Sequence, residues 1–167
     1  MEFRVEIEGL KGIGQRSAEI QAAVQKEIKK ALYSSAQEVA NEAKRSIKGG
    51  GKSGRIYTHY LFTKNGRIMI GRKRDEPHQA SAPGEAPATD SGRLVNSIIA
   101  RMNTVSGEEA FVYIPKSTVK YATLLEFGTS KMAPRPFLFP AFERKKQWIR
   151  DRLNEGVRRG IAAASKK

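Results

Sequence analysis

One long stretch of helical periodicity constrains the fold of this chain more than any other feature of its sequence. Apolar side chains recur mostly four positions apart from residue 17 to 47 and form one stripe: Ile20, Val24, Ile28, Leu32, Val39, Ala43 and Ile47. A helix of this length with one apolar face needs a second layer to pack against. Ser17 is its predicted N-cap. The run Gly49–Gly51 is predicted to end the helix and to begin a flexible link.

Short segments of strand character surround this helix. Residues 3–7 alternate apolar and charged side chains, which predicts a half-buried strand. Residues 56–70 are rich in β-branched and aromatic side chains, and the central Asn65–Gly66 pair favours a two-residue turn, so we predict a protruding β-hairpin. Residues 98–102 and 110–114 are predicted to form two further strands.

The last third of the chain predicts two more helices. Residues 119–127 form a short one with Gly128 just past its end, where we expect a left-handed cap. Residues 141–165 form the C-terminal helix, with one apolar face: Phe142, Ile149, Leu153, Val157 and Ile161. The order of elements predicts a single α+β domain over residues 1–167. In it, a long N-terminal helix and a C-terminal helix pack on an antiparallel sheet.

Prolines and glycines dominate residues 73–92. Proline fixes its own φ and restricts the residue before it, so this segment is predicted to be an extended arm. Loops of this length are uncommon unless they carry a function or are disordered. Asp90 is a candidate cap for a short helix through Leu94 and Val95.

The charge of the chain points to an anionic partner. Its 31 Lys and Arg against 17 Asp and Glu give a formal charge of +14. Residues 44–74 contain ten of these cations and no acidic residue, and a second excess lies in residues 143–167. A free DNA-binding protein is therefore one hypothesis for its function. The candidate DNA-facing residues are Arg55, Lys64, Arg67, Arg72, Lys73 and Arg74.

Composition also limits the other classes of function. The chain has no Cys, which excludes disulfides and thiol catalysis. We expect no membrane partner, because no run approaches the roughly 20 apolar residues that span a bilayer. The N-terminal residues lack the apolar stretch of a signal peptide, so we expect a protein that is soluble when made and is not exported.

Sequences that partly match known motifs do not predict an enzyme. Lys48–Ser53 resembles the end of a phosphate-binding loop, but Ser46 stands where the pattern requires its first Gly. Gly12–Gly14 resembles a DNA-gripping helical hairpin, but the preceding residues alternate as a strand does. His59 and His78 lack a metal-ligand spacing, and an Mg²⁺ site or a nuclease built on Asp75, Glu85 or Asp90 is the weaker interpretation of an acidic loop. We therefore expect no catalytic residue, metal or cofactor.

Two stretches carry a resemblance to a known family. They are Ala80–Ile98 (ASAPGEAPATDSGRLVNSI) and Tyr121–Ala141 (YATLLEFGTSKMAPRPFLFPA). Together they resemble the head–tail joining, or tail-completion, proteins of long-tailed bacteriophages. The resemblance implies a non-enzymatic α+β subunit of the virion that assembles as a ring, with sixfold symmetry, around the DNA channel of the neck. It also implies contacts with portal-side connector proteins and with a tail terminator or tail tube protein.

The same two stretches supply the candidate assembly residues. Extended proline-rich segments can pair with a neighbour's sheet edge, and a dense apolar knot of Phe127, Phe137, Leu138 and Phe139 follows. We predict that the arm and this knot clasp neighbouring copies of the chain, and that Glu126 pairs with Arg135. The candidate assembly residues are Pro83, Gly84, Pro87, Gly92, Leu94, Tyr121, Glu126, Phe127, Gly128, Arg135, Pro136, Phe137 and Pro140.

Overall fold

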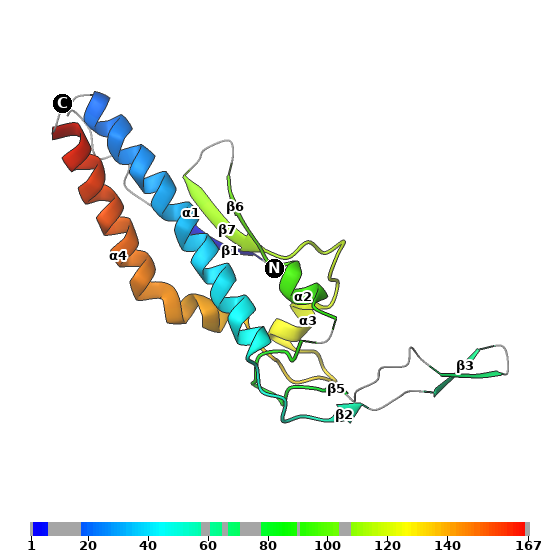
Figure 1. The fold of residues 1–167 in the computed structure, drawn as a ribbon. Helices are drawn as coiled ribbons and strands as arrows, with labels where there is room; N and C mark the ends of the chain where they lie inside the picture. Colours follow the sequence, from blue (N-terminus) through cyan, green and yellow to red (C-terminus); the bar gives the residue numbers. More distant parts are fainter. Residues whose placement is uncertain are drawn as a thin grey trace.

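The computed structural model describes residues 2–6, 18–57, 61–64, 67–70, 78–89, 91–103 and 108–165. Its elements, in chain order, are β1 (Glu2–Glu6), α1 (Ala18–Lys48), β2 (Ile56–Tyr57), β3 (Leu61–Lys64), β4 (Arg67–Ile70), β5 (His78–Gln79), α2 (Arg93–Asn96), β6 (Ile99–Met102), β7 (Glu109–Tyr113), α3 (Ala122–Phe127) and α4 (Leu138–Ser165) (Figure 1). Ser17, Asn65–Gly66 and Asp90 lie outside the described residues.

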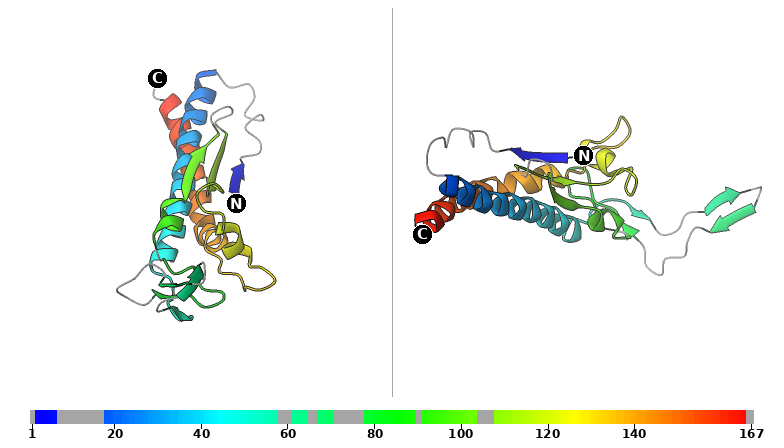
Figure 2. Two further views of the ribbon diagram at one scale, coloured as in Figure 1. Left: turned by 90° about the vertical axis from the view of Figure 1, so that its right-hand side faces the viewer. Right: turned by 90° about the horizontal axis from the view of Figure 1, so that it is seen from above.

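A three-stranded antiparallel sheet and two long helices form the body of the molecule. The strand order is β1-β7-β6, so the first strand of the chain lies beside a strand that is formed more than a hundred residues later. α1 packs against β6 and β7 and also lies along α4 (Figures 1 and 2). This arrangement confirms the predicted α+β class with a long helix at either end of the chain.

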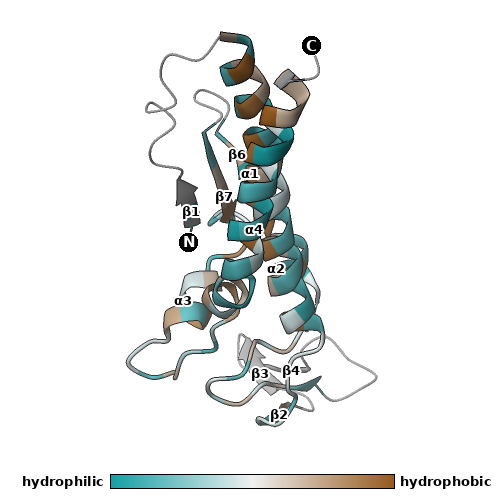
Figure 3. Ribbon diagram, turned by 90° about the vertical axis from the view of Figure 1, so that its left-hand side faces the viewer, coloured by the Kyte–Doolittle hydropathy of each residue, from teal (hydrophilic) through white to brown (hydrophobic). Residues whose placement is uncertain are grey.

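The core lies along the predicted apolar stripe of α1. Six of the seven stripe residues are fully buried, and Ile20 packs at the margin of the core. The sheet contributes Ala110 and Val112, and α4 contributes Leu138, Ala141 and Ile149. Hydrophilic and hydrophobic residues alternate along both long helices (Figure 3), as expected for helices with one buried face.

The protruding hairpin is confirmed in part. β3 pairs with β4 in the register Lys64↔Arg67, and Figure 1 shows this pair away from the helices. Ile56 and Tyr57 do not continue into β3 as one strand, however. They form β2, which pairs with His78 and Gln79 of β5, residues that were predicted to belong to the extended arm.

Two glycines allow α4 to approach α1 closely. Gly156 and Gly160 are buried and lie one turn apart on α4. A Cβ atom added at Gly160 would lie 2.4 Å from the Cα of Val24, whereas one at Gly156 would lie 3.1 Å from the Cβ of Ala31. Only glycine fits at position 160, because the obstructing atom belongs to the backbone of the facing helix.

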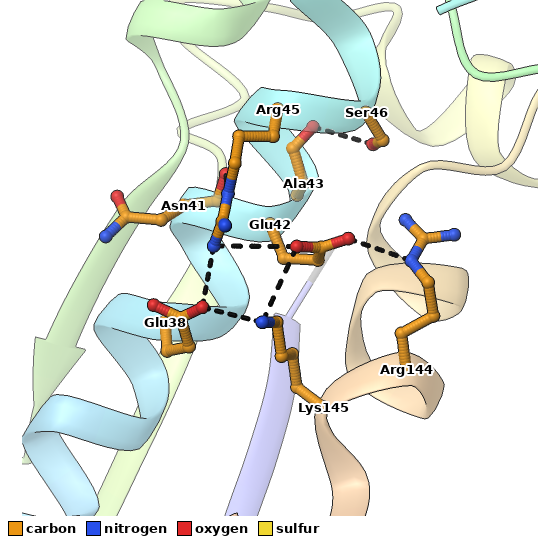
Figure 4. A network of polar contacts seen from close by, with 8 residues as sticks. All are labelled: Glu38, Asn41, Glu42, Ala43, Arg45, Ser46, Arg144 and Lys145. Atoms are coloured by element: carbon orange, nitrogen blue, oxygen red, sulfur yellow. Dashed lines mark hydrogen bonds and ion pairs between the residues drawn. The ribbon is translucent and has the colours of Figure 1, made fainter. Parts of the chain in front are cut away.

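Ion pairs join the same two helices near the other end of α4. The Glu38 carboxylate receives hydrogen bonds from Lys145 Nζ at 2.8 Å and from Arg45 at 2.6 Å (Figure 4). Glu42 accepts a bond of 2.9 Å from Arg144 Nε. The bond from Lys145, and then the bond from Arg45, lower the pKa of the Glu38 carboxyl below its ordinary value.

In the part of the chain that the structure describes, no helix combines the length and the apolarity that a bilayer crossing requires.

We predict that Gly160→Ala destabilises the protein, although alanine favours helices over glycine by about 1 kcal/mol. The added methyl group forces α1 and α4 apart, and overpacking of this kind costs roughly 1–3 kcal/mol. Gly156→Ala is the matched control and is expected to cost less. Thermal unfolding of the three proteins measures the difference. A Gly160→Ala protein that melts at or above the wild-type temperature would contradict the close approach.

We predict that Glu38→Gln lowers the free energy of unfolding at neutral pH by about 1 kcal/mol or less, as partly exposed ion pairs do. The pKa of Glu38 is lower in the folded than in the unfolded state, so its contribution is complete above the ordinary value of 4.5 and is lost as the pH falls through the lowered value. Denaturant unfolding as a function of pH should show that the unfolding free energies of the wild-type and Glu38→Gln proteins become equal in acid. If the difference in unfolding free energy stays constant down to acidic pH, the result contradicts the stabilising role of the Glu38 ion pairs.

Candidate assembly site

The candidate assembly residues converge where five segments meet beside the C-terminal end of α1. We call this region the junction: residues 49–55, residues 78–89, α2 with the preceding Gly92, α3 with the preceding Tyr121, and residues 128–136. Figure 1 shows these segments gathered at the end of the helix pair from which the β3–β4 hairpin projects. The junction contains every candidate assembly residue except Phe137 and Pro140, which follow it directly.

Residues 78–89, the described part of the predicted arm, dock on the glycine-rich segment that follows α1. Ala80 N–H donates to Arg55 O at 3.0 Å, and Gly54 N–H donates to Ala80 O at 2.8 Å. A Cβ atom at Gly54 would lie 2.4 Å from Ser81 O, so the contact requires glycine. The glycines after α1 therefore allow close backbone contact, which goes beyond the flexible link that we predicted.

A turn at Pro83–Glu85 is held by its own acidic side chain. The Glu85 carboxylate accepts hydrogen bonds from Ser53 Oγ at 2.6 Å and from Ala82 N–H at 2.7 Å. The bond from Ser53 contributes most to lowering the pKa of the Glu85 carboxyl, and the bond from Ala82 contributes next. Gly84 has a φ of 82°, and its N–H donates to Pro134 O at 2.9 Å.

Residues 78–89 of the predicted arm contain one strand and one turn, and they dock on the rest of the chain. Ser81 and Pro87 are buried in the chain's own surface, and the turn at Gly84 directs the backbone onto residues 134–135. The sequence pattern did not reveal this because the docking partners lie about 30 and 50 residues away along the chain.

Glu126 caps the N-terminus of α4. Its carboxylate is 3% exposed and accepts hydrogen bonds from the N–H groups of Phe137 (2.8 Å), Leu138 (3.1 Å) and Phe139 (2.7 Å). The first N–H groups of a helix have no partner within the helix, and the helix dipole favours a negative charge there. A buried carboxylate that is fully hydrogen-bonded in this way fixes α3 to the start of α4.

The predicted pair between Glu126 and Arg135 is wrong. Arg135 Nε instead donates to Ser81 O at 3.1 Å, and Arg135 N–H donates to Leu125 O at 2.7 Å. The expectation that the carboxylate needs a partner was sound, but backbone donors satisfy it. α4 begins at Leu138, three residues earlier than predicted, which places these donors beside Glu126. Pro140 lies in the first turn of α4, where a missing N–H costs little.

Three glycines of the junction have positive φ, and Gly84 is the one described above. Gly92 (φ 74°, ψ −3°) is left-handed and precedes α2. Gly128 ends α3 with φ 76° and ψ −173°, so the positive φ that we predicted is present but the conformation is not the left-handed cap. It belongs to a region that only glycine adopts. A Cβ atom there would lie 2.7 Å from Met132 O, across the turn that joins Thr129 to Met132.

The predicted apolar knot is divided between the core and the surface. Phe137 and Leu138 are completely buried in this chain, whereas Phe127 and Phe139 are 66% and 52% exposed. Tyr121 and Leu124 are also exposed, at 45% and 48%. The junction thus stabilises the subunit itself and still presents apolar side chains to solvent.

A cavity of about 290 Å³ opens within the junction between the docked arm, α2 and α3. Ser81, Pro87, Arg93, Leu94, Tyr121 and Arg135 are among the residues that line it. Arg93 lies on α2, and one of its terminal nitrogens is 3.4 Å from Thr118 O. Sequence reasoning did not single out Ser53, Ser81 or Arg93, because each contributes through contacts that are distant along the chain.

The structure places only part of the candidate DNA-facing set. Arg55 is exposed beside the docked arm; Lys64 and Arg67 belong to β3 and β4; Arg72, Lys73 and Arg74 lie outside the described residues. On α4, Arg144 and Lys145 pair with glutamates of α1, and Arg159 pairs with Glu155. The C-terminal basic excess is therefore partly engaged in ion pairs within the chain.

The acidic residues once considered for Mg²⁺ do not form a described site. Asp75 and Asp90 lie outside the described residues, and Glu85 is bonded to Ser53 and Ala82. Among the residues that the structure describes, no three His, Cys, Asp or Glu side chains gather closely enough to hold a metal ion.

Comparison with known proteins yields one match. A family model described as "Bacteriophage HK97-gp10, putative tail-component" matches residues 12–128. No curated protein and no solved structure matches the chain. The matched region extends from before α1 to Gly128 and therefore includes the docked arm, α2 and α3.

We predict that Glu126→Ala lowers the free energy of unfolding by about 2–4 kcal/mol, because it leaves three N–H groups at the start of α4 without their charged acceptor. Glu126→Gln should cost less, since the amide retains one acceptor oxygen. Denaturant unfolding measures both.

Arg135→Ala provides the control for the partner that the sequence suggested. No hydrogen bond joins the side chains of Glu126 and Arg135, so the costs of Glu126→Gln and Arg135→Ala should add to within about 0.5 kcal/mol in the double variant. A large coupling energy between them would revive the salt-bridge hypothesis.

Proposed function

The chain belongs to the HK97-gp10-like family of bacteriophage tail components, and we propose that it is one subunit of a ring in the phage neck. Membership of the family makes it a structural component of the virion. The proposal adds that the ring is formed by six copies, that it joins the head to the tail, and that it surrounds the channel through which the DNA passes.

The two open edges of the sheet carry the ring proposal. In the order β1-β7-β6, β1 and β6 each pair with β7 alone among the described strands. Such edges are templates for pairing with another chain. A contact between the β6 edge of one copy and the β1 edge of the next joins two different surfaces and is therefore head-to-tail. Head-to-tail contacts close into rings when the rotation permits.

Apolar side chains beside the β6 edge support the same proposal. Tyr33 and Ile99 line a groove between α1 and β6, and they are 41% and 39% exposed. The next subunit could cover this groove beside the open edge of β6. That contact would bury apolar area and would also complete the backbone hydrogen bonds of the edge.

The proposal includes no catalysis. Two carboxylates of the described junction are committed to structural hydrogen bonds: Glu126 to the N-terminus of α4, and Glu85 to Ser53 and Ala82. The proposed partners are copies of the chain, portal-side connector proteins and a tail terminator or tail tube protein. Channel DNA would lie nearby, facing the basic residues of the β3–β4 hairpin.

The charge of residues 44–74 favours one alternative, a free DNA-binding protein. Binding of duplex DNA by the monomer, weakening steeply as salt rises, supports that alternative. DNA affinity that appears only in the assembled ring supports the proposed ring of the phage neck.

We predict that Ala100→Pro blocks ring formation and preserves the subunit fold. Asn103 N–H donates to Glu109 O, so in the alternating antiparallel ladder the N–H of Ala100 points away from β7, toward the open edge. Proline removes that outward donor and leaves the bonds between β6 and β7 in place.

Native mass spectrometry and electron microscopy measure the outcome. The wild-type protein and the Ala100→Val control, which retains the N–H group, should both form rings. The Ala100→Pro protein should remain a monomer with a wild-type circular dichroism spectrum. If the wild-type protein is a monomer at all concentrations, or if Ala100→Pro still forms rings, the edge-to-edge ring is wrong.

A further inference from the structure

α3 has the reverse of the usual amphipathic pattern. Its only charged side chain, Glu126, is buried, whereas Tyr121, Leu124 and Phe127, spaced three apart, share the exposed face. The cap on α4 produces this orientation, because the carboxylate must point inward to reach the N–H groups of residues 137–139. The apolar face therefore has no role in the core of the subunit.

The arginine-lined cavity lies directly beside this face. Tyr121 belongs to both, since it is exposed on α3 and also lines the cavity with Arg93 and Arg135. Each guanidinium has five N–H donors. Arg135 uses Nε on Ser81 O, and Arg93 makes one long contact with Thr118 O. Among the described residues, neither pairs with a carboxylate.

The flanking residues give this surface a positive charge. Lys120 directly precedes Tyr121, Lys131 follows Gly128 by three residues, and both are exposed. Two acidic side chains of the described junction, Glu85 and Glu126, are bound by donors of the chain itself. An apolar strip that has, at one end, two arginines without a carboxylate partner among the described residues, and lysines around it, is complementary to an apolar segment that carries carboxylates.

We propose that the exposed face of α3 and the arginine-lined cavity form one binding surface for an acidic, apolar peptide segment of a different protein. An Asp or Glu side chain of that segment enters the cavity and receives paired hydrogen bonds from Arg93 and Arg135. Its aliphatic or aromatic side chains cover Leu124 and Phe127. The inference rests on the proposed function, in which this protein joins other neck proteins.

Charge decides between a different protein and a second copy of this chain. The chain carries +14, and the same surface on a copy is basic, so two such surfaces repel each other. Apolar side chains also favour a peptide over nucleic acid, because Leu124 and Phe127 offer nothing to a phosphate backbone.

Selection from a random-peptide library on the immobilised wild-type protein tests the proposal. Enriched sequences should combine Asp or Glu with Leu, Ile or Phe. The dissociation constant of the strongest peptide is then measured by fluorescence anisotropy against the variants Arg93→Ala and Phe127→Ser. Both substitutions lie on the surface, and each should weaken binding about tenfold, as the loss of a central arginine or aromatic contact does.

Matched controls separate this surface from general attraction to a basic protein. Arg158→Ala removes the same charge from an exposed site on α4, and Ile161→Ser removes an exposed apolar side chain near the end of α4. Both should leave the affinity within about twofold.

Four outcomes would overturn the proposal. The first is a selection without enrichment, and the second is equal weakening of peptide binding by Arg158→Ala and Arg93→Ala. The third is competition by a single-stranded oligonucleotide whose binding also needs Arg93 and Phe127. The fourth is loss of rings in Phe127→Ser. The last would mean that a second copy covers α3. Intact rings together with failed peptide binding would refute this inference and leave the ring untouched.

Discussion

The hydrogen bonds between Glu126 and the start of α4 are the interaction on which the junction depends. They connect a short helix, too short to be stable by itself, to the longest continuous contact in the molecule, the α1–α4 pair. Because the Glu126 carboxylate points inward, the rotation of α3 about its own axis is fixed. The same bonds therefore stabilise the subunit and decide which side chains it offers to other proteins.

Much of the fold follows from patterns that are local in sequence. The apolar stripe of α1, the alternation in β1, the two sheet strands before α3, and the hairpin register at Lys64 and Arg67 all agree with the structure. Each depends on residues within a few positions of one another, where periodicity and turn chemistry are informative. The prediction started α4 just after Pro140, whereas the helix begins at Leu138 and includes this proline in its first turn, where proline is tolerated.

The junction was less accessible to the same reasoning. Its contacts join residues far apart in the chain: Ser53 with Glu85, Ser81 with Arg135, and Glu126 with residues 137–139. A proline-rich segment predicts restricted backbone angles but not the surface on which it lies, so the arm was expected to be extended. One signal was available and unused: Gly156 and Gly160, four apart inside a predicted helix, indicate a close helix contact.

The sheet pairs β1 with a strand that follows it by about a hundred residues, and this has a consequence for the order of folding. β1 and α1 are synthesised first, but β1 pairs with β7, and α1 packs along α4. Contacts of such large sequence separation form slowly, since a long loop must close before they stabilise the chain. A nascent subunit emerging from the ribosome therefore keeps its first strand unpaired until residue 113 has been translated. The topology itself thus delays the appearance of a finished sheet during synthesis.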